Sequence, residues 1–213
     1  MKNIFIVLGV LCFWISPSRA QEESISPFLF EDYKEATVFI GMNQAKGKLN
    51  FYMPTGDFLY IDESDNNQVK ILSRPEEISM IRFGTRIFLP SVKGGVEVLS
   101  TEPVFYVQYK ASIRDKGKIV GYGGTSSIGG VKSYSLNSSG TAFVSDPMTL
   151  VVGQLYNVYY LGKKQKEIKS MKQFLKYYSK HQETLEKYIK EKNIKFNDAL
   201  QMLQLVQYAH SLD

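Results

Sequence analysis

Residues 36–61 of the chain read ATVFIGMNQAKGKLNFYMPTGDFLYI, and this stretch decides the fold class. It holds three short runs, at 36–40, 48–53 and 57–61, that are rich in β-branched and aromatic residues and alternate with other types. The turn-forming residues Pro54 and Gly56 separate the last two runs. Connections this short favour antiparallel neighbours, because a parallel pair needs a crossover of a dozen or more residues.

The same alternation continues toward the C-terminus. Five further runs follow, at 68–72, 78–82, 86–89, 95–99 and 104–109. Turn-forming residues such as Asn66, Gly84 and Gly94 lie between them. The pattern predicts an antiparallel β-meander of about seven or eight strands, and we expect it to curl into a roll or open barrel that leaves few edges exposed.

The pattern changes over residues 112–147. Glycines and serines are frequent between 117 and 140, which predicts a flexible loop with one weak strand near 133–136. Gly124 and Gly129 have the spacing of a phosphate-binding loop, but Gly130 and Val131 stand where that loop needs Lys and Ser or Thr. A strand-like run resumes at 155–161, and we expect it to return to the sheet.

The chain from about Lys163 onward has helical periodicity. Apolar residues of a first helix fall at helix spacing: Ile168, Met171, Leu175 and Tyr178. The fold class is therefore α+β, with the meander followed by a tail of about three helices. The predicted domains are the β-domain at 21–162, including the loop, and the helical tail at 163–213.

Residues with capping chemistry divide this tail. Ser179 and Gln182 match a capping box, so a second helix is expected to start there. Asn193 tolerates the left-handed conformation that ends a helix, and Asn197 is the predicted N-cap of a third helix at 198–210. In that helix Gln201, Gln204 and Gln207 form one polar sector, so the remaining wide arc needs cover.

Residues 1–20 predict a secretory signal peptide. Lys2 precedes an apolar run too short to span a bilayer, and Ser18 and Ala20 are the small residues expected before a cleavage site. Cleavage after Ala20 would remove Cys12, the only cysteine, and Trp14, the only tryptophan. An exported chain without disulfides suits a bacterium, so we expect the mature protein in the periplasm or cell envelope, with no transmembrane segment.

The charge is unevenly distributed. Residues 21–160 hold 13 basic and 15 acidic residues, whereas residues 161–213 hold 11 lysines and 6 acidic residues. The basic character therefore belongs to the tail. A division of this kind suggests two parts with different surfaces.

The spacing of apolar residues in the tail is similar to that of a known group of proteins. The segments at 174–178 and 185–196, with Leu200, Leu203 and Val206, resemble the C-terminal part of uncharacterised secreted envelope proteins of Gram-negative bacteria. Those chains also begin with a signal peptide and a strand series. The resemblance implies a β-strand domain with a helical tail, and it supplies no activity and no functional residues.

Several catalytic and metal-binding chemistries find no support in the sequence. His181 and His210 both lie in the tail, so the β-domain alone cannot assemble a Ser-His-Asp triad. The predicted mature chain has no cysteine for a zinc site. A carboxylate hydrolase stays arithmetically possible, although no spacing singles out a pair among the acids considered, Asp62, Glu63, Glu76 and Glu97. We predict no catalytic residue, no metal and no cofactor.

The acidic stretch at 62–67 partly matches a calcium loop. Asp62, Ser64 and Asn66 occupy alternate ligand positions, but Asn67 replaces the glycine and Ser73 replaces the final glutamate. A hairpin turn is the better interpretation, because Asp and Asn favour such turns.

A lysine stripe is the candidate binding site. On the expected first helix, Lys169, Lys172, Lys176 and Lys180 share one side. Such a stripe can contact an anionic lipid or polysaccharide, or it can be the solvated face of an amphipathic helix. Nucleic acid is not expected as a partner of an exported chain that lacks a recognisable nucleic-acid-binding module.

These observations predict an exported, non-catalytic envelope protein that binds a partner protein or a surface polymer. The first alternative is a small-ligand carrier that uses a cavity inside the curled sheet. The second is a carboxylate-dependent hydrolase.

Overall fold

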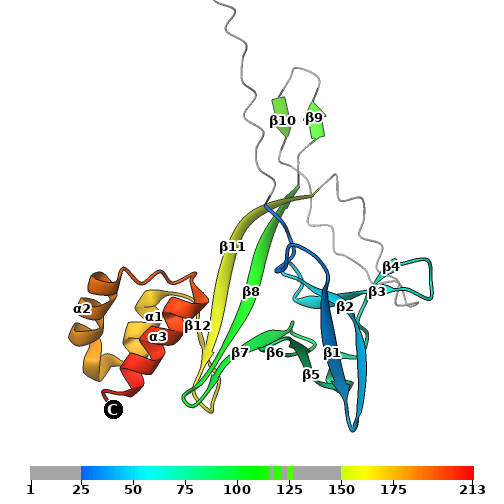
Figure 1. Ribbon diagram of the computed structural model, residues 1–213. Helices are drawn as coiled ribbons and strands as arrows, with labels where there is room; N and C mark the ends of the chain where they lie inside the picture. Colours follow the sequence, from blue (N-terminus) through cyan, green and yellow to red (C-terminus); the bar gives the residue numbers. More distant parts are fainter. Residues whose placement is uncertain (1–24, 116–117, 121–123, 127–149) are drawn as a thin grey trace, which may run out of the picture.

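The computed structural model of the protein describes residues 25–115, 118–120, 124–126 and 150–213 (Figure 1). The strands are β1 (Lys34–Ile40), β2 (Asn43–Tyr52), β3 (Asp57–Asp62), β4 (Gln68–Ile71), β5 (Ile78–Phe83), β6 (Arg86–Leu89), β7 (Val96–Thr101), β8 (Val104–Asp115), β9 (Lys118–Val120), β10 (Gly124–Ser126), β11 (Leu150–Leu161) and β12 (Lys166–Ile168). The helices are α1 (Met171–Tyr177), α2 (Gln182–Lys192) and α3 (Ala199–His210), with short 3-10 turns η1 (Pro75–Glu77) and η2 (Ser179–His181).

Ten of the described strands form one antiparallel sheet in the order β12-β11-β8-β7-β6-β5-β1-β2-β3-β4. The α+β prediction is confirmed, and the sheet curls without closing, since β12 and β4 lie at its two ends. The order departs from a simple meander at one place. After β4 the chain returns through η1 to the other side of β1, where β5 pairs with it. That return brings Ile78, Ile81 and Phe83 into the sheet interior.

All eight predicted strand runs correspond to β1–β8. The run at 155–161 lies within β11 and returns to the sheet as expected, where it pairs with β8. The predicted turns have the backbone that their residues favour. Gly84 between β5 and β6 has a φ of 57°, and Asn66 and Asn67 between β3 and β4 have φ values of 52° and 58°. Residues 62–67 are thus a hairpin turn.

The predicted loop at 112–147 is wrong at its start. Residues 112–115 continue β8, and β9 pairs with β10 as a short hairpin. Partners on β11 extend the β8 ladder, for example Ile113 opposite Val152. The weak strand expected near 133–136 lies outside the described residues.

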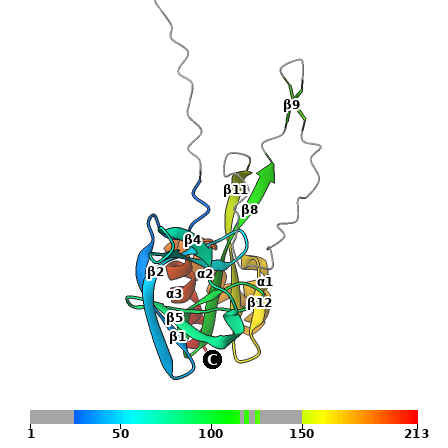
Figure 2. The ribbon, with the colours of Figure 1, turned by 90° about the vertical axis from the view of Figure 1, so that its right-hand side faces the viewer.

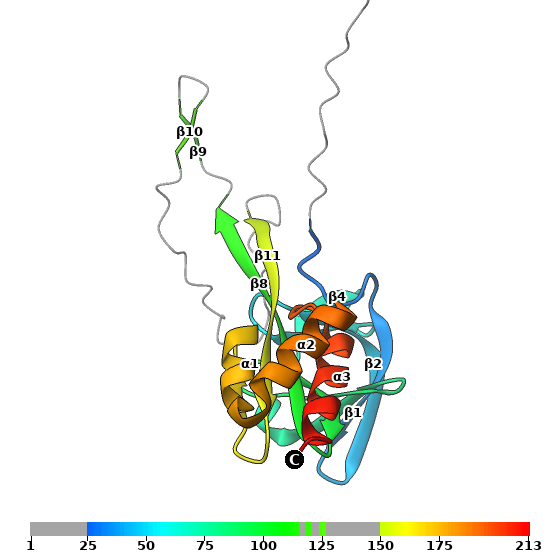
Figure 3. The ribbon, with the colours of Figure 1, turned by 90° about the vertical axis from the view of Figure 1, so that its left-hand side faces the viewer.

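Two hydrophobic cores lie along the same face of β8, since Phe105 and Val107 of the first core and Ala111 of the second occupy alternate positions of this strand. The first, the helix core, joins β8, β11 and β12 to the three helices, which cover these strands in Figure 3. Its buried residues are Phe105, Val107, Tyr159, Leu161, Ile168, Phe174, Tyr178, Leu185, Ile194, Met202, Leu205, Val206 and Ala209. The tail therefore packs on the sheet of its own chain.

The second core, the phenylalanine core, fills the curl of β1–β6, which faces the viewer in Figure 2. Its buried residues are Phe30, Ala36, Val38, Leu49, Phe51, Met53, Phe58, Ile78, Ile81, Phe83, Phe88 and Ala111. The rings of Phe51, Phe58, Phe83 and Phe88 lie in mutual contact, with centroids 5.0–6.3 Å apart in the recorded pairs. Phe30, from the segment before β1, closes this core beside Phe83.

The tail begins differently from the prediction. A tight turn with positive φ at Gly162 and Gln165 leads into β12, so Ile168 reaches the core from a strand and not from a helix. Helix α1 is consequently shorter than expected, and Ser170 caps it by accepting a hydrogen bond from Gln173 N. Of the helices in the described ranges, none is long and apolar enough to cross a membrane.

The predicted caps have mixed outcomes. Asn193 adopts the left-handed conformation at the end of α2, which confirms that prediction. The capping box does not form, because Ser179 belongs to η2 and His181 is the N-cap of α2 without a side-chain bond. The third helix is capped by Asp198 and not by Asn197, since Asp198 Oδ1 accepts from Leu200 N and Gln201 N at 3.0 Å each.

Candidate binding cleft

A cleft of about 810 Å³ lies where β12 ends beside β11. The three residues of β12 pair with Tyr159–Leu161 only, so the earlier part of β11 extends past them. The start of α1 and the segment before α3 form the opposite side. The residues that line the whole cleft are Lys93, Gln108, Lys110, Gln154, Tyr156, Asn157, Val158, Tyr160, Glu167, Lys169, Ser170, Met171, Phe196 and Asn197.

One side of the cleft is fixed by a buried glutamine on β8. Gln108 Nε2 donates to the carbonyl oxygen of Lys93 at 2.9 Å, and its Oε1 accepts from the Tyr160 hydroxyl at 3.2 Å. Burial, together with the nearby Glu167 carboxylate, raises the pKa of Tyr160. The Tyr160 hydroxyl therefore keeps its proton at neutral pH and holds Gln108 in place.

The floor is held by a second set of hydrogen bonds that reaches the tail. Asn157 Nδ2 donates to the Tyr159 hydroxyl at 3.1 Å and to the Asn197 carbonyl at 2.9 Å. The Tyr159 hydroxyl donates to the Phe196 carbonyl at 2.7 Å, and burial raises the pKa of Tyr159. These bonds tie the segment before α3 to β11 and so join one part of the opposite side of the cleft to this strand.

The charged side chains that line the cleft are mostly positive. The lining includes the lysines Lys93, Lys110 and Lys169 and one carboxylate, that of Glu167, which lies 3.1 Å from Lys169 Nζ. Lys169 stays 58% exposed in this pair, so water screens the interaction. The cleft thus combines a net positive charge with amides and tyrosines that can donate and accept hydrogen bonds.

The predicted lysine stripe is divided by the structure. Lys169 lies between β12 and α1 and lines the cleft, whereas Lys172 and Lys176 are exposed on α1. Lys180 lies in η2. The prediction that the four lysines share one helix is therefore wrong. Helix α1 has only seven residues, because β12 takes the residues before it.

The acids considered for hydrolysis have other partners. Asp62 accepts from Lys70 Nζ at 2.7 Å and from Ser64 Oγ at 2.6 Å, and these hydrogen bonds lower the pKa of Asp62 to about 2. Glu63 lies 3.6 Å from Lys48 Nζ, and Glu76 is exposed in η1. Among the described residues no group of three His, Cys, Asp or Glu side chains could hold a metal ion.

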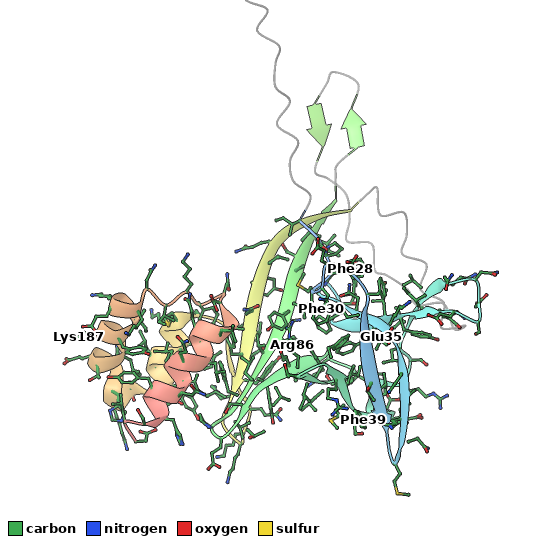
Figure 4. All side chains as sticks on the ribbon, in the orientation of Figure 1. Phe28, Phe30, Glu35, Phe39, Arg86 and Lys187 are labelled. Atoms are coloured by element: carbon green, nitrogen blue, oxygen red, sulfur yellow. The ribbon has the colours of Figure 1, made fainter. Side chains whose placement is uncertain are left out.

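Glu97 is the one acid of this set that is buried, at 5% exposure, and it lies between the two cores. Its carboxylate accepts two hydrogen bonds from Arg86, at 2.7 and 2.8 Å, and one from the Tyr109 hydroxyl at 2.6 Å. The Arg86 guanidinium also lies over the Phe30 ring, 4.9 Å from its centroid, as Figure 4 illustrates. Both hydrogen-bond partners of Glu97 on β7 come from neighbouring strands, Arg86 from β6 and Tyr109 from β8. This indicates a structural role for the triad of Arg86, Glu97 and Tyr109.

The sequence offered few signals for the cleft. Gln108 and Asn157 are polar residues inside otherwise apolar strand runs, and this is the pattern that could have marked them.

No known protein family, curated protein or solved structure matches the chain. The resemblance to secreted envelope proteins therefore stays a prediction.

Proposed function

We propose that the chain is an exported, non-catalytic binding protein of a bacterial cell envelope, and that an extended anionic ligand occupies the cleft beside β11. The observation that carries the proposal is the cleft lining: three lysines against one glutamate, among amide and tyrosine side chains held by hydrogen bonds. Fixed amides and hydroxyls suit the polar backbone of a polymer, and the lysines suit its charge.

Other observations favour binding over the two alternatives. A carrier needs space inside the curled sheet, and contacting phenylalanine rings occupy that interior. A hydrolase needs two carboxylates that face one bond, whereas Asp62 and Glu97 are each engaged by a cation. Among the described residues that line the cleft, Glu167 is the one with a carboxylate.

A charge-reversal experiment tests the proposal. Lys110→Glu/Lys169→Glu changes two lysines of the cleft, and Lys172→Glu/Lys176→Glu makes the same change in net charge on α1 outside it. Fluorescein-labelled poly-L-glutamate and dextran sulfate serve as peptide and polysaccharide polyanions, with binding followed by fluorescence anisotropy at low and physiological ionic strength. We expect the cleft variant to bind about tenfold more weakly or worse, and the α1 variant to bind as the original chain does.

Other outcomes would contradict the proposal. Equal losses in the two variants would mean that net charge alone governs binding. A loss confined to the α1 variant would move the site to Lys172 and Lys176, as the lysine stripe predicted from the sequence would have it. Failure of both polyanions to bind the original chain would argue against an anionic ligand.

A further inference from the structure

The outer edge of β11 extends beyond its partner strand. β11 pairs with β8 from Leu150 to Leu161, but β12 covers only the last three of these residues. In the described part of the chain, no strand lies against the edge from Val152 to Val158. At about 3.3 Å per residue, this stretch measures roughly 20 Å. Gln154, Leu155 and Tyr156 are exposed in it, whereas Asn157 and Val158 are largely buried and line the cleft.

Recorded hydrogen bonds show which backbone groups face outward. Gly162 N donates to the Val104 carbonyl at 2.8 Å, and Gln154 N donates to Ser112 Oγ at 2.8 Å, so both amides point toward β8. Backbone groups of alternate residues point to opposite sides of a strand. The amides of Leu155 and Asn157 therefore point away from β8, toward the open edge.

This edge lacks the features that natural proteins use to prevent strand pairing. Residues 152–158 read VGQLYNV, without a charged residue or a proline. Leu155 and Tyr156 are 40% and 38% exposed there. The opposite end of the sheet differs, because Lys70 on β4 forms ion pairs with Asp62 and Asp65 along that edge.

The charges beside the open edge select the partner. Lys110 lies on β8 opposite Tyr156, and Lys169 lies just past β12, so both flank the same part of the edge. A strand from a second copy of this chain would bring a second set of these lysines to the edge, and like charges would oppose the pairing. An acidic strand would be attracted.

We propose that an acidic, extended peptide segment of a partner protein adds to β11 as a further strand beyond the end of β12. This inference rests on the proposed function and names its ligand class. Main-chain hydrogen bonds to the amides and carbonyls of Leu155 and Asn157 supply the affinity, and alternate side chains of the segment meet Lys110 and Lys169.

N-methylated peptides test this geometry without altering the protein. The probe is an octapeptide of alternating threonine and glutamate, made in three forms: unmodified, N-methylated at every threonine, and N-methylated at every glutamate. In an added strand only one of the two amide sets points to β11, so one methylated form should lose binding and the other should bind close to the unmodified peptide. Equal binding by both methylated forms would overturn the proposal.

A matched pair of variants tests the edge itself. Leu155→Pro removes an outward amide that β8 does not use, and Leu155→Thr removes the same side chain but keeps that amide. We expect the octapeptide to bind at least about tenfold more weakly to the proline variant than to the threonine variant, with unchanged circular dichroism in both. If the proline variant unfolds, the methylated peptides still decide the question.

The controls separate this inference from the proposed function. Binding of dextran sulfate in the cleft without binding of the octapeptide would overturn strand addition and leave the anionic-ligand proposal standing. Absence of binding by both probes would contradict both. Concentration-dependent dimerisation that Leu155→Pro abolishes, without peptide binding, would assign the edge to a second copy and overturn the acidic-peptide partner.

Discussion

The phenylalanine core and the helix core lie along the same face of β8, yet the chain builds them in different ways. The phenylalanine core draws nearly all its buried residues from 30–88, on strands that mostly follow one another in sequence. The helix core joins β8 to residues as distant as Ala209. Tyr109 packs against both cores, so the two share one strand and one side chain. The comparison teaches that the basic tail is a structural layer and not an appendage.

The sharpest test of this comparison removes one large buried side chain from each core. Phe88 and Leu205 are both fully buried. Phe88→Ala should lower the free energy of unfolding by about 3–5 kcal/mol, and Leu205→Ala by about 2–5 kcal/mol, because each leaves a cavity in addition to the lost apolar contact. Thermal unfolding followed by far-ultraviolet circular dichroism measures both.

The number of transitions then decides whether the cores are one unit. We expect a single transition at lower temperature in each variant, because β8 and β11 contribute to the helix core while β8 also joins the rest of the sheet. Two separate transitions in Leu205→Ala would mean that the helices unfold independently. In that case the division at residue 162 would describe two folding units.

The triad between the cores should have the next largest effect. Arg86→Met leaves the Glu97 carboxylate buried with the Tyr109 hydroxyl as its remaining recorded hydrogen-bond donor. Breaking a buried pair from one side costs about 3–5 kcal/mol, and we expect the lower end because the Arg86 side chain is 36% exposed. Urea unfolding measures the loss.

A double variant is the control for this triad. Arg86→Met/Glu97→Leu removes both charges and should recover most of the stability, because no unpaired charge is left between the cores. A double variant as unstable as Arg86→Met would show that packing of the guanidinium on Phe30 and Phe88 matters more than the ion pair.

The difference between local sequence patterns and contacts between distant residues explains what could be predicted from the sequence. The strands β1–β8 were predictable because each is a period-two run between turn residues, and the exposed Gln204 and Gln207 were predictable from the helical period of α3. β12 was not, since three residues are too few to show a period, and its lysine and glutamate resemble the start of a helix. The departure of β5 to the far side of β1 depends on contacts that local patterns do not encode.

The cleft was predictable only in part. Lys169 was singled out as a member of a helical stripe, but it lines the cleft because β12 ends just before it. Gln108, Asn157 and Asn197 come together through pairing of β8 with β11 and through packing of the tail. Such contacts join residues far apart in the chain, so a pass along the sequence cannot assemble them.

The smallest expected effect concerns the cap of α3, where two adjacent residues have the same capping chemistry. Asp198 Oδ1 accepts from two backbone amides, whereas the recorded contact of Asn197 uses its main-chain carbonyl, which accepts from Asn157. Asp198→Ala should therefore cost about 1 kcal/mol of unfolding free energy. Asn197→Ala should cost much less, because alanine keeps that carbonyl. Urea unfolding of the two variants compares them directly, and a larger loss in Asn197→Ala would restore the cap predicted from the sequence.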